Sequence, residues 1–139
     1  MLKLSILSIG KTKEKWLEEA CSEYIKRLKT SARITCLWGR DEAQLVEWAN
    51  KEAFVVCLDP KGLLLTSEEL SGFLMKSWET GGSRLSIVIG GANGLPMELK
   101  QKPLISLSRL TFTHQMTRLI LLEQIYRSLE IQKGSQYHK

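Results

Sequence analysis

The chain of 139 residues has little of several features that mark particular classes of protein. Its three cysteines, Cys21, Cys36 and Cys57, are widely spaced and form no Cys-x-x-Cys pair, so we expect buried, reduced thiols and no metal site. No apolar run approaches the ~18–20 residues that span a bilayer. The N-terminus alternates polar and apolar residues and lacks the apolar core of a signal peptide. We therefore expect a cytoplasmic protein without a membrane partner.

What the chain does contain is typical of a globular protein. Hydrophobic residues make up 43% and charged residues 25%, with no repeat or linker, which predicts a single domain over residues 1–139. The net charge of +5 lies entirely in residues 100–139, which hold seven basic and two acidic residues. Clustered positive charge suits a polyanion such as RNA or DNA, although a solvated basic face would have the same composition.

Alternating hydrophobic patterns predict an α/β fold with a mostly parallel sheet and helices on both faces. The predicted strands cover residues 2–9, 32–38, 53–58, 84–89 and 105–112. The predicted helices cover residues 13–28, 41–50, 66–78 and 115–131, with a short helix after Pro96. Thr66 and Glu69 predict a capping box, with Ser67 as an alternative N-cap, and Asp59-Pro-Lys-Gly62 predicts a turn. The last helix is apolar nearly all round, which favours burial of its second face in a two-fold dimer, although full burial within one subunit would also explain it.

The most informative stretch is Ile89-Gly-Gly-Ala-Asn-Gly-Leu95, where an apolar strand runs into a glycine-rich turn. We expect Gly90 and Gly91 to let the backbone approach a ligand and adopt positive φ. The spacing matches neither the dinucleotide fingerprint nor the P-loop. Two more loops, one after Leu58 and one over residues 107–112, follow apolar strands. Because ligands bind beyond the carboxyl ends of parallel strands, the three loops predict one pocket suited to a nucleoside.

Several motifs together resemble the RlmH family of small SPOUT-class methyltransferases, related to proteins once known as YbeA. They are the glycine-rich turn, Leu107-Ser-Arg-Leu-Thr-Phe-Thr-His-Gln-Met116, Glu123-Gln-Ile-Tyr-Arg127 and the terminal Tyr137-His-Lys139. Leu4-Ser-Ile-Leu-Ser-Ile-Gly-Lys11 and Glu23-Tyr-Ile-Lys-Arg-Leu28 are also similar to that family. The resemblance covers essentially the whole chain.

The resemblance implies a SPOUT-type fold with a C-terminal trefoil knot and a homodimer with its active site at the subunit interface. It implies an S-adenosylmethionine-dependent enzyme that methylates N3 of a pseudouridine in 23S rRNA of the large ribosomal subunit. No metal is needed, because the sulfonium already activates the methyl group. By matching motifs, the cofactor-binding residues are Leu58, Gly90, Leu107, Ser108, Arg109, Leu110, Thr111 and Phe112.

The chain departs from the family in two places. Thr113 stands where the family has a proline before the histidine, and proline would fix φ at that corner. The region between Trp38 and Phe54 is shorter than in relatives, which puts the second helix in doubt.

Four residues are candidates for the substrate side. Arg127 is the first choice for holding a phosphate or base carbonyl, with an i,i+4 ion pair to Glu123 as the alternative. His138 is the candidate base or RNA contact, and Tyr137 could stack on a base, whereas a frayed tail is the alternative for both. Arg118 is assigned to RNA phosphate, with a surface ion pair as the alternative.

Two further functions stay open on the residues alone. One is a flavodoxin-like nucleotide-binding domain, and the other is a basic RNA-binding protein without catalysis. His114 is expected to have a structural role beside the third loop. Trp16, Trp38, Trp48 and Trp78 are expected in the core or at an interface rather than on a base-stacking surface.

Overall fold

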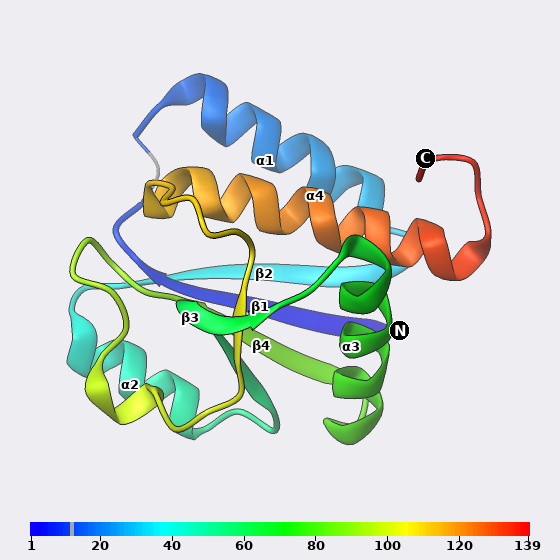
Figure 1. The fold of residues 1–139 in the computed structure, drawn as a ribbon. Helices are drawn as coiled ribbons and strands as arrows, with labels where there is room; N and C mark the ends of the chain where they lie inside the picture. The colour runs from blue at the N-terminus through cyan, green and yellow to red at the C-terminus, as the bar shows by residue number, and fades with distance from the viewer. Residues whose placement is uncertain (12) are drawn as a thin grey trace.

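The computed structural model describes residues 1–11 and 13–139. Its centre is a five-stranded parallel sheet in the order β2-β1-β4-β3-β5 (Figure 1). The strands are β1 (Leu2–Ile9), β2 (Ala32–Gly39), β3 (Val55–Leu64), β4 (Arg84–Ile89) and β5 (Leu104–Ser106). The helices are α1 (Lys15–Leu28), α2 (Glu42–Asn50), α3 (Ser67–Thr80), the short 3-10 helix η1 (Met97–Leu99) and α4 (His114–Lys133). The predicted α/β class and parallel sheet are confirmed.

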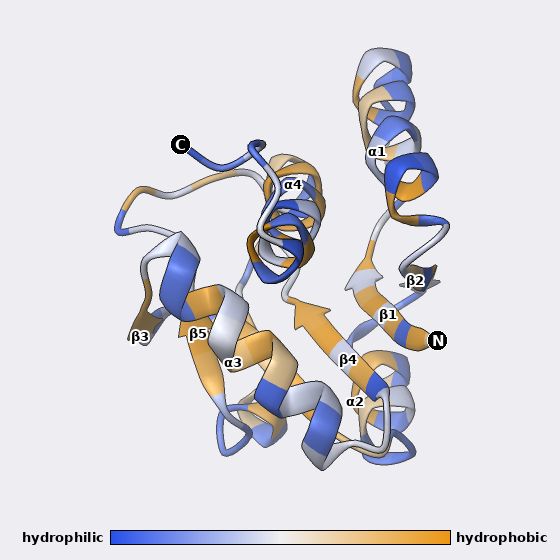
Figure 2. Ribbon diagram, turned by 90° about the vertical axis from the view of Figure 1, so that its right-hand side faces the viewer, coloured by the Kyte–Doolittle hydropathy of each residue, from blue (hydrophilic) through white to orange (hydrophobic). Residues whose placement is uncertain are grey.

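Helices cover the sheet on both faces, and each face has its own apolar cluster. The larger cluster joins α1, α3 and α4 to the strands, with Ile6, Leu74 and Leu121 fully buried. The smaller cluster joins α2 and η1 to the opposite face through Leu45 and Leu99. In Figure 2 the hydrophobic strands lie between these helices, as the near-continuous apolar runs of β3 and β4 predict.

Local capping signals explain where several helices begin. The capping box is confirmed: Thr66 Oγ1 accepts a hydrogen bond from the Glu69 backbone, and the Glu69 carboxylate accepts one from the Thr66 backbone. Asp41 caps α2 by accepting from Gln44 N at 2.9 Å, so this helix forms despite the short connection around it.

Two predicted boundaries are wrong. The expected turn at 59–62 lies inside β3 as an irregularity, because Leu58 and Leu63 both pair with Ile105 of β5. The expected fifth strand over 105–112 is only three residues long, and residues 107–113 form a loop. A Cβ on Gly62 would lie 2.6 Å from the carbonyl carbon of Ile105, so glycine allows these two segments to cross closely.

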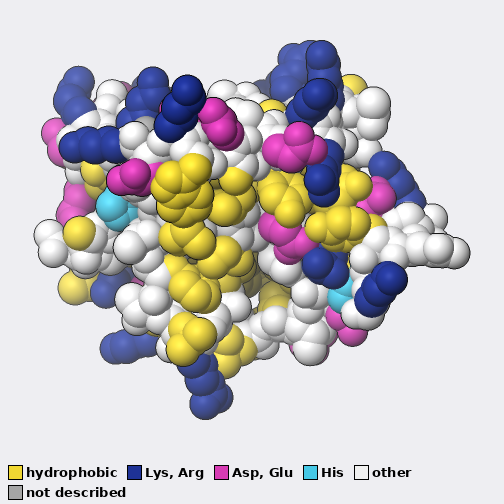
Figure 3. Space-filling view, turned by 90° about the horizontal axis from the view of Figure 1, so that it is seen from above, with side chains coloured by type: hydrophobic (Ala, Val, Ile, Leu, Met, Phe, Trp, Pro, Cys, Tyr) yellow, Lys and Arg dark blue, Asp and Glu magenta, His cyan; other side chains and the backbone are white. Residues whose placement is uncertain are grey.

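The outward face of α4 remains apolar and only half-buried in the single chain. Its half-buried side chains are Met116, Leu119, Ile120, Tyr126 and Ile131. Figure 3 shows hydrophobic side chains gathered in the centre of the face that carries α1 and α4, with Lys and Arg around them. Trp78 is buried, whereas 58% of Trp16 and 38% of Trp38 are exposed. Within the described residues, no helix combines the length and apolarity needed to cross a membrane.

Candidate active site

A cavity of about 520 Å³ opens at the carboxyl edge of the sheet. Three segments contribute lining residues: residues 58–60 of β3, most of residues 89–95 from the end of β4 onward, and most of residues 106–114 from the end of β5 to the start of α4, joined by Thr117 of α4. These are the three segments that the sequence predicts to meet, and the volume lies within the range of small-molecule pockets, about 300–1,000 Å³. No group of three or more His, Cys, Asp or Glu side chains suited to a metal ion occurs in the part of the chain that the structure describes.

Seven of the eight predicted cofactor residues line this cavity. They are Leu58, Gly90, Leu107, Ser108, Leu110, Thr111 and Phe112. The exception is Arg109, which is exposed and does not line the cavity in this structure. Sequence reasoning missed Ser106 and Thr117. Thr117 lies three residues after His114 and therefore on the same side of α4, which is a periodicity that could have identified it.

The glycine-rich turn has a different geometry from the one expected. Neither Gly90 nor Gly91 has positive φ, and the left-handed residue is Gly94, with φ of 84°. Gly94 N donates to Gly91 O at 2.9 Å, which folds the turn back on itself. A Cβ on Gly90 would lie 2.5 Å from the carbonyl carbon of Gly94. Glycine is therefore required at position 90 for the turn to close, and the closed turn forms one wall of the cavity.

Short side chains shape the third loop. Ser106 Oγ donates to the Ser108 carbonyl at 2.9 Å, and Ser108 Oγ accepts from Leu110 N at 3.0 Å. Thr113, where the resemblance leads us to expect a proline, is the N-cap of α4 and accepts from Met116 N at 3.2 Å. Its φ of −61° is the value that a proline would impose. Thr113 therefore keeps the backbone geometry of a proline and adds a cap.

The C-terminal tail is docked on α3 and α4. Arg127 forms a 2.8 Å ion pair with Glu123, and Tyr137 Oη donates to the same carboxylate at 2.8 Å. The Tyr137 ring also contacts Tyr126 edge-on and lies under the Arg127 guanidinium. Burial acts to raise the pKa of Glu123, but the hydrogen bonds from Arg127 and Tyr137 outweigh it and lower that pKa. These contacts hold the tail against α4, in contrast to the frayed tail that was the alternative.

His138 lies between a cation and a carboxylate. Its Nδ1 is 3.0 Å from Arg127 Nη1, and its Nε2 is 3.0 Å from Glu68 Oε1. A guanidinium can only donate, so Nδ1 must accept, and the proton must sit on Nε2 and point to Glu68. Both ring nitrogens of His138 are therefore engaged by partners in this structure.

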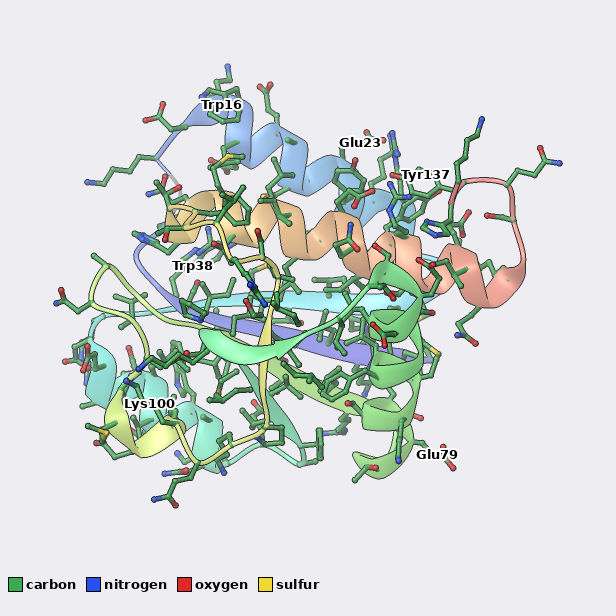
Figure 4. All side chains as sticks on the ribbon, in the orientation of Figure 1. Trp16, Glu23, Trp38, Glu79, Lys100 and Tyr137 are labelled. Atoms are coloured by element: carbon green, nitrogen blue, oxygen red, sulfur yellow. The ribbon has the colours of Figure 1, made fainter. Side chains whose placement is uncertain are left out.

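The tail and the cavity lie at opposite ends of α4. His114 lines the cavity, and Arg127 follows about 20 Å further along the helix at about 1.5 Å per residue. Figure 4 shows Trp38 near the start of α4 and Tyr137 further along the helix, where its ring contacts Tyr126 and Arg127. Within one chain, Arg127 and His138 therefore do not reach the cavity.

Arg118 is not where an RNA contact would be. Its side chain is 1% exposed and its Nη2 donates to Ser8 Oγ at 2.6 Å and to the Gly10 carbonyl at 3.3 Å. Because the guanidinium is covered, both the expected phosphate contact and the alternative surface ion pair are wrong for this structure.

Comparison with known proteins decides the family. The sequence profile described as "Predicted SPOUT methyltransferase" matches residues 2–138. The chain belongs to the SPOUT methyltransferase family. It is 68% identical, over the full length of both chains, to the ribosomal RNA large subunit methyltransferase H of Protochlamydia amoebophila. It is 38% identical to the protein of that name from Carboxydothermus hydrogenoformans, over 99% of this chain and 100% of the relative. These relatives confirm the resemblance to RlmH.

The SPOUT fold is also found among solved structures. Lpg2936 from Legionella pneumophila, solved in complex with the cofactor SAM, aligns with a TM-score of 0.52 and 11% sequence identity. The alignment covers 92% of this SPOUT chain and 66% of the Legionella chain. At this identity the likeness concerns the fold alone.

Proposed function

We propose that this protein transfers the methyl group of S-adenosylmethionine to N3 of a pseudouridine in 23S rRNA of the large ribosomal subunit. The observation that carries the proposal is the cavity at the carboxyl edge, which seven of the eight family-matched cofactor residues line. Full-length relatives named ribosomal RNA large subunit methyltransferase H support ribosomal RNA as the substrate. The basic excess of residues 100–139 suits a polyanionic partner.

The cavity fits the methyl donor in size and chemistry. A nucleoside requires an apolar slot with a few backbone hydrogen bonds, and Leu58, Ile89 and Leu107 supply apolar walls beside the backbone of the glycine-rich turn. When bound, S-adenosylmethionine supplies an electrophilic methyl group on a sulfonium. The chain must then hold the nucleobase in line and help remove the N3 proton.

Arg127 and His138 are the residues proposed for that work. His138 is proposed to take up the proton through Nδ1 once that atom is released from Arg127, and Arg127 can stabilise negative charge on the base or hold a phosphate. Tyr137 packs next to both and is proposed to contact the RNA. Because Arg127 lies about 20 Å along α4 from the cavity-lining His114 of its own chain, with Tyr137 and His138 packed beside it, we propose that they act at the cavity of a second subunit.

A homodimer is therefore part of the proposal. The half-buried apolar face of α4 supports it, since a two-fold pairing of antiparallel α4 helices brings the last turn of one beside the first turn of the other. The C-terminal knot implied by the family is also proposed. The close crossing of Gly62 and Ile105 is compatible with a chain that passes through a loop. The proposed compartment is the cytoplasm, where ribosomes work.

Methyl transfer to ribosomal particles tests the proposal. Purified protein is incubated with tritiated S-adenosylmethionine and large subunits or assembled ribosomes from a strain that lacks the modification. Label in 23S rRNA at N3 of a pseudouridine is the expected result. Absence of label in both particles would overturn the activity, and label at another atom would overturn the assigned position. Flavin binding without S-adenosylmethionine binding would instead favour a flavodoxin-like domain.

A further inference from the structure

Arg118 is a buried cation at the junction of α4 with the carboxyl ends of β1 and β2. Its Nη2 donates to Ser8 Oγ at 2.6 Å and to the Gly10 carbonyl at 3.3 Å. Its guanidinium carbon lies 5.3 Å from the centre of the Trp38 ring. Ser8 and Trp38 are partners in the β1–β2 register, so one guanidinium contacts both strands where they end.

The same junction adjoins the cavity on two sides. Ser8 is also the partner of Ile89 on β4, and Ile89 lines the cavity. On α4, Thr117 precedes Arg118 and His114 lies one turn before it, and both line the cavity. A Cβ on Gly10, which has φ of 81°, would lie 3.5 Å from His114 Nε2, so the turn after β1 packs against the first turn of α4.

We propose that Arg118 is a positioning residue that fixes the first turns of α4, and with them the third loop, against the sheet so that the methyl-donor cavity is preformed. The guanidinium suits this task because its planar fork bonds several acceptors at once in fixed directions. A leucine or methionine in its place would fill the space without defining where α4 stands over Ser8 and Gly10. The inference rests on the proposed cofactor but concerns a residue outside the cavity lining.

Because position 118 is buried, the presence of an arginine there says something about its role. Burial lowers the pKa of the Arg118 guanidinium, yet arginine stays protonated in proteins, so a cation is kept in the interior. Buried charges are costly unless their bonds are satisfied, and apolar residues of similar volume are often equally stable there. A role in geometry, rather than in stability, accounts for a cation at this point.

Four variants test the assignment. Arg118→Met removes all directed bonds, Arg118→Lys keeps a cation with fewer donors, and Ser8→Ala removes one acceptor with little change in volume. The matched control is Trp78→Phe, which breaks the hydrogen bond from the buried Trp78 side chain to the Lys3 carbonyl (2.9 Å) at the opposite end of β1. For each variant, calorimetry gives the dissociation constant of S-adenosylmethionine in the absence of RNA, and amide hydrogen exchange of the intact protein gives local opening. Urea unfolding gives the free energy of unfolding.

For Arg118→Met we expect the dissociation constant of S-adenosylmethionine to rise about tenfold, with partial rescue in Arg118→Lys and a smaller rise in Ser8→Ala. Exchange should quicken in residues 107–117 and stay unchanged in residues 67–80. Trp78→Phe should lower the free energy of unfolding without weakening the binding of S-adenosylmethionine.

Two results would overturn the inference. One is an Arg118 variant whose S-adenosylmethionine affinity and whose amide exchange in residues 107–117 both match the wild type. If the Arg118 variants do not fold, the same result in Ser8→Ala counts. The other is a Trp78→Phe variant that loses as much S-adenosylmethionine affinity as the Arg118 variants do. A wild-type protein that does not bind S-adenosylmethionine would overturn the proposed function, and unchanged exchange in the variants would still count separately against the positioning role.

Discussion

Arg127 Nη1 donates to His138 Nδ1 at 3.0 Å, and this single contact selects the tautomer of the histidine ring. Because Nδ1 is the acceptor, the ring proton sits on Nε2 and points to Glu68. The histidine proposed as a base therefore has to release Arg127 before Nδ1 can take up a proton. The contact also keeps the arginine and the histidine together, so they would enter a partner's site as a pair.

Replacement of His138 tests its role in proton transfer. We expect His138→Ala to lower turnover about 100-fold, since a positioned general base contributes about 10²–10⁴-fold. The dissociation constant of S-adenosylmethionine should not change, because the ring lies far from the cavity of its own chain. Gln136→Ala, an exposed change in the same tail, is the control. Single-turnover kinetics on ribosomes measure the rate, and an unimpaired His138→Ala enzyme would remove the histidine from the mechanism.

Mixing two inactive variants tests whether the tail acts across subunits. One variant carries Gly90→Val in the cavity and the other carries His138→Ala in the tail. If each site combines one subunit's cavity with the partner's tail, mixed dimers regain one intact site, and an equal mixture should recover about a quarter of full activity. If cavity and tail act within one chain, mixed dimers contain no intact site. Recovery after co-refolding, measured by tritium transfer, distinguishes these outcomes.

A conservative change at Gly90 tests the glycine-rich turn itself. A methyl group there meets the Gly94 backbone at 2.5–2.6 Å, so Gly90→Ala should open the turn and weaken S-adenosylmethionine binding about tenfold or more. Gly72→Ala is the matched control, since Gly72 is exposed in α3 with nothing within 4 Å of an added Cβ. That control should raise the free energy of unfolding by about 0.5–1 kcal/mol and leave binding unchanged. Calorimetry and urea unfolding measure both quantities.

Local sequence patterns correctly predicted the structural features that depend on residues close together in the sequence. The capping box of Thr66 and Glu69 and the apolar β4 were predicted, because their causes lie within a few residues. The irregularity at 59–62 was interpreted as a turn, since Pro60 and Gly62 favour one, but pairing with Ile105 keeps those residues in β3. Such a contact is decided by the sheet and not by the local sequence.

Part of the candidate site was also predicted from local patterns, and part of it was missed. Loops after apolar strands predicted the cavity, because parallel strands end at one edge. The burial of Arg118 was missed because Ser8 and Gly10, which accept from it, lie 110 and 108 residues earlier in the chain. A basic residue on an apolar helix gives no local sign that Ser8 and Gly10 will meet it.

Thr113 allows a test of the family's proline. Thr113→Ala should lower the free energy of unfolding by about 1 kcal/mol, because the bond to Met116 N is lost from the start of α4. Thr113→Pro should cost less than Thr113→Ala, because φ of −61° already suits proline and the unfolded chain loses freedom. Urea unfolding compares the two, and a proline variant less stable than the alanine variant would contradict this interpretation.

The pairing of Glu123 predicts how stability changes with pH. Its pKa in the folded protein lies below the ordinary value of 4.5, so the folded state binds fewer protons than the unfolded state as the pH falls through this range. The stabilisation is therefore fully present above about pH 4.5 and is lost as the pH drops through the lowered pKa. The side chains of Glu123 and its ion-pair partner Arg127 are both partly exposed. We therefore expect the pair to contribute about 1 kcal/mol or less to the free energy of unfolding. Glu123→Gln should reduce the loss of stability between pH 5 and 3, measured by urea unfolding. Glu79→Gln, an exposed change in α3, is the control and should follow the wild-type profile. A Glu123→Gln profile that also matched the wild type would show that the hydrogen bonds from Arg127 and Tyr137 do not favour the charged Glu123 carboxylate.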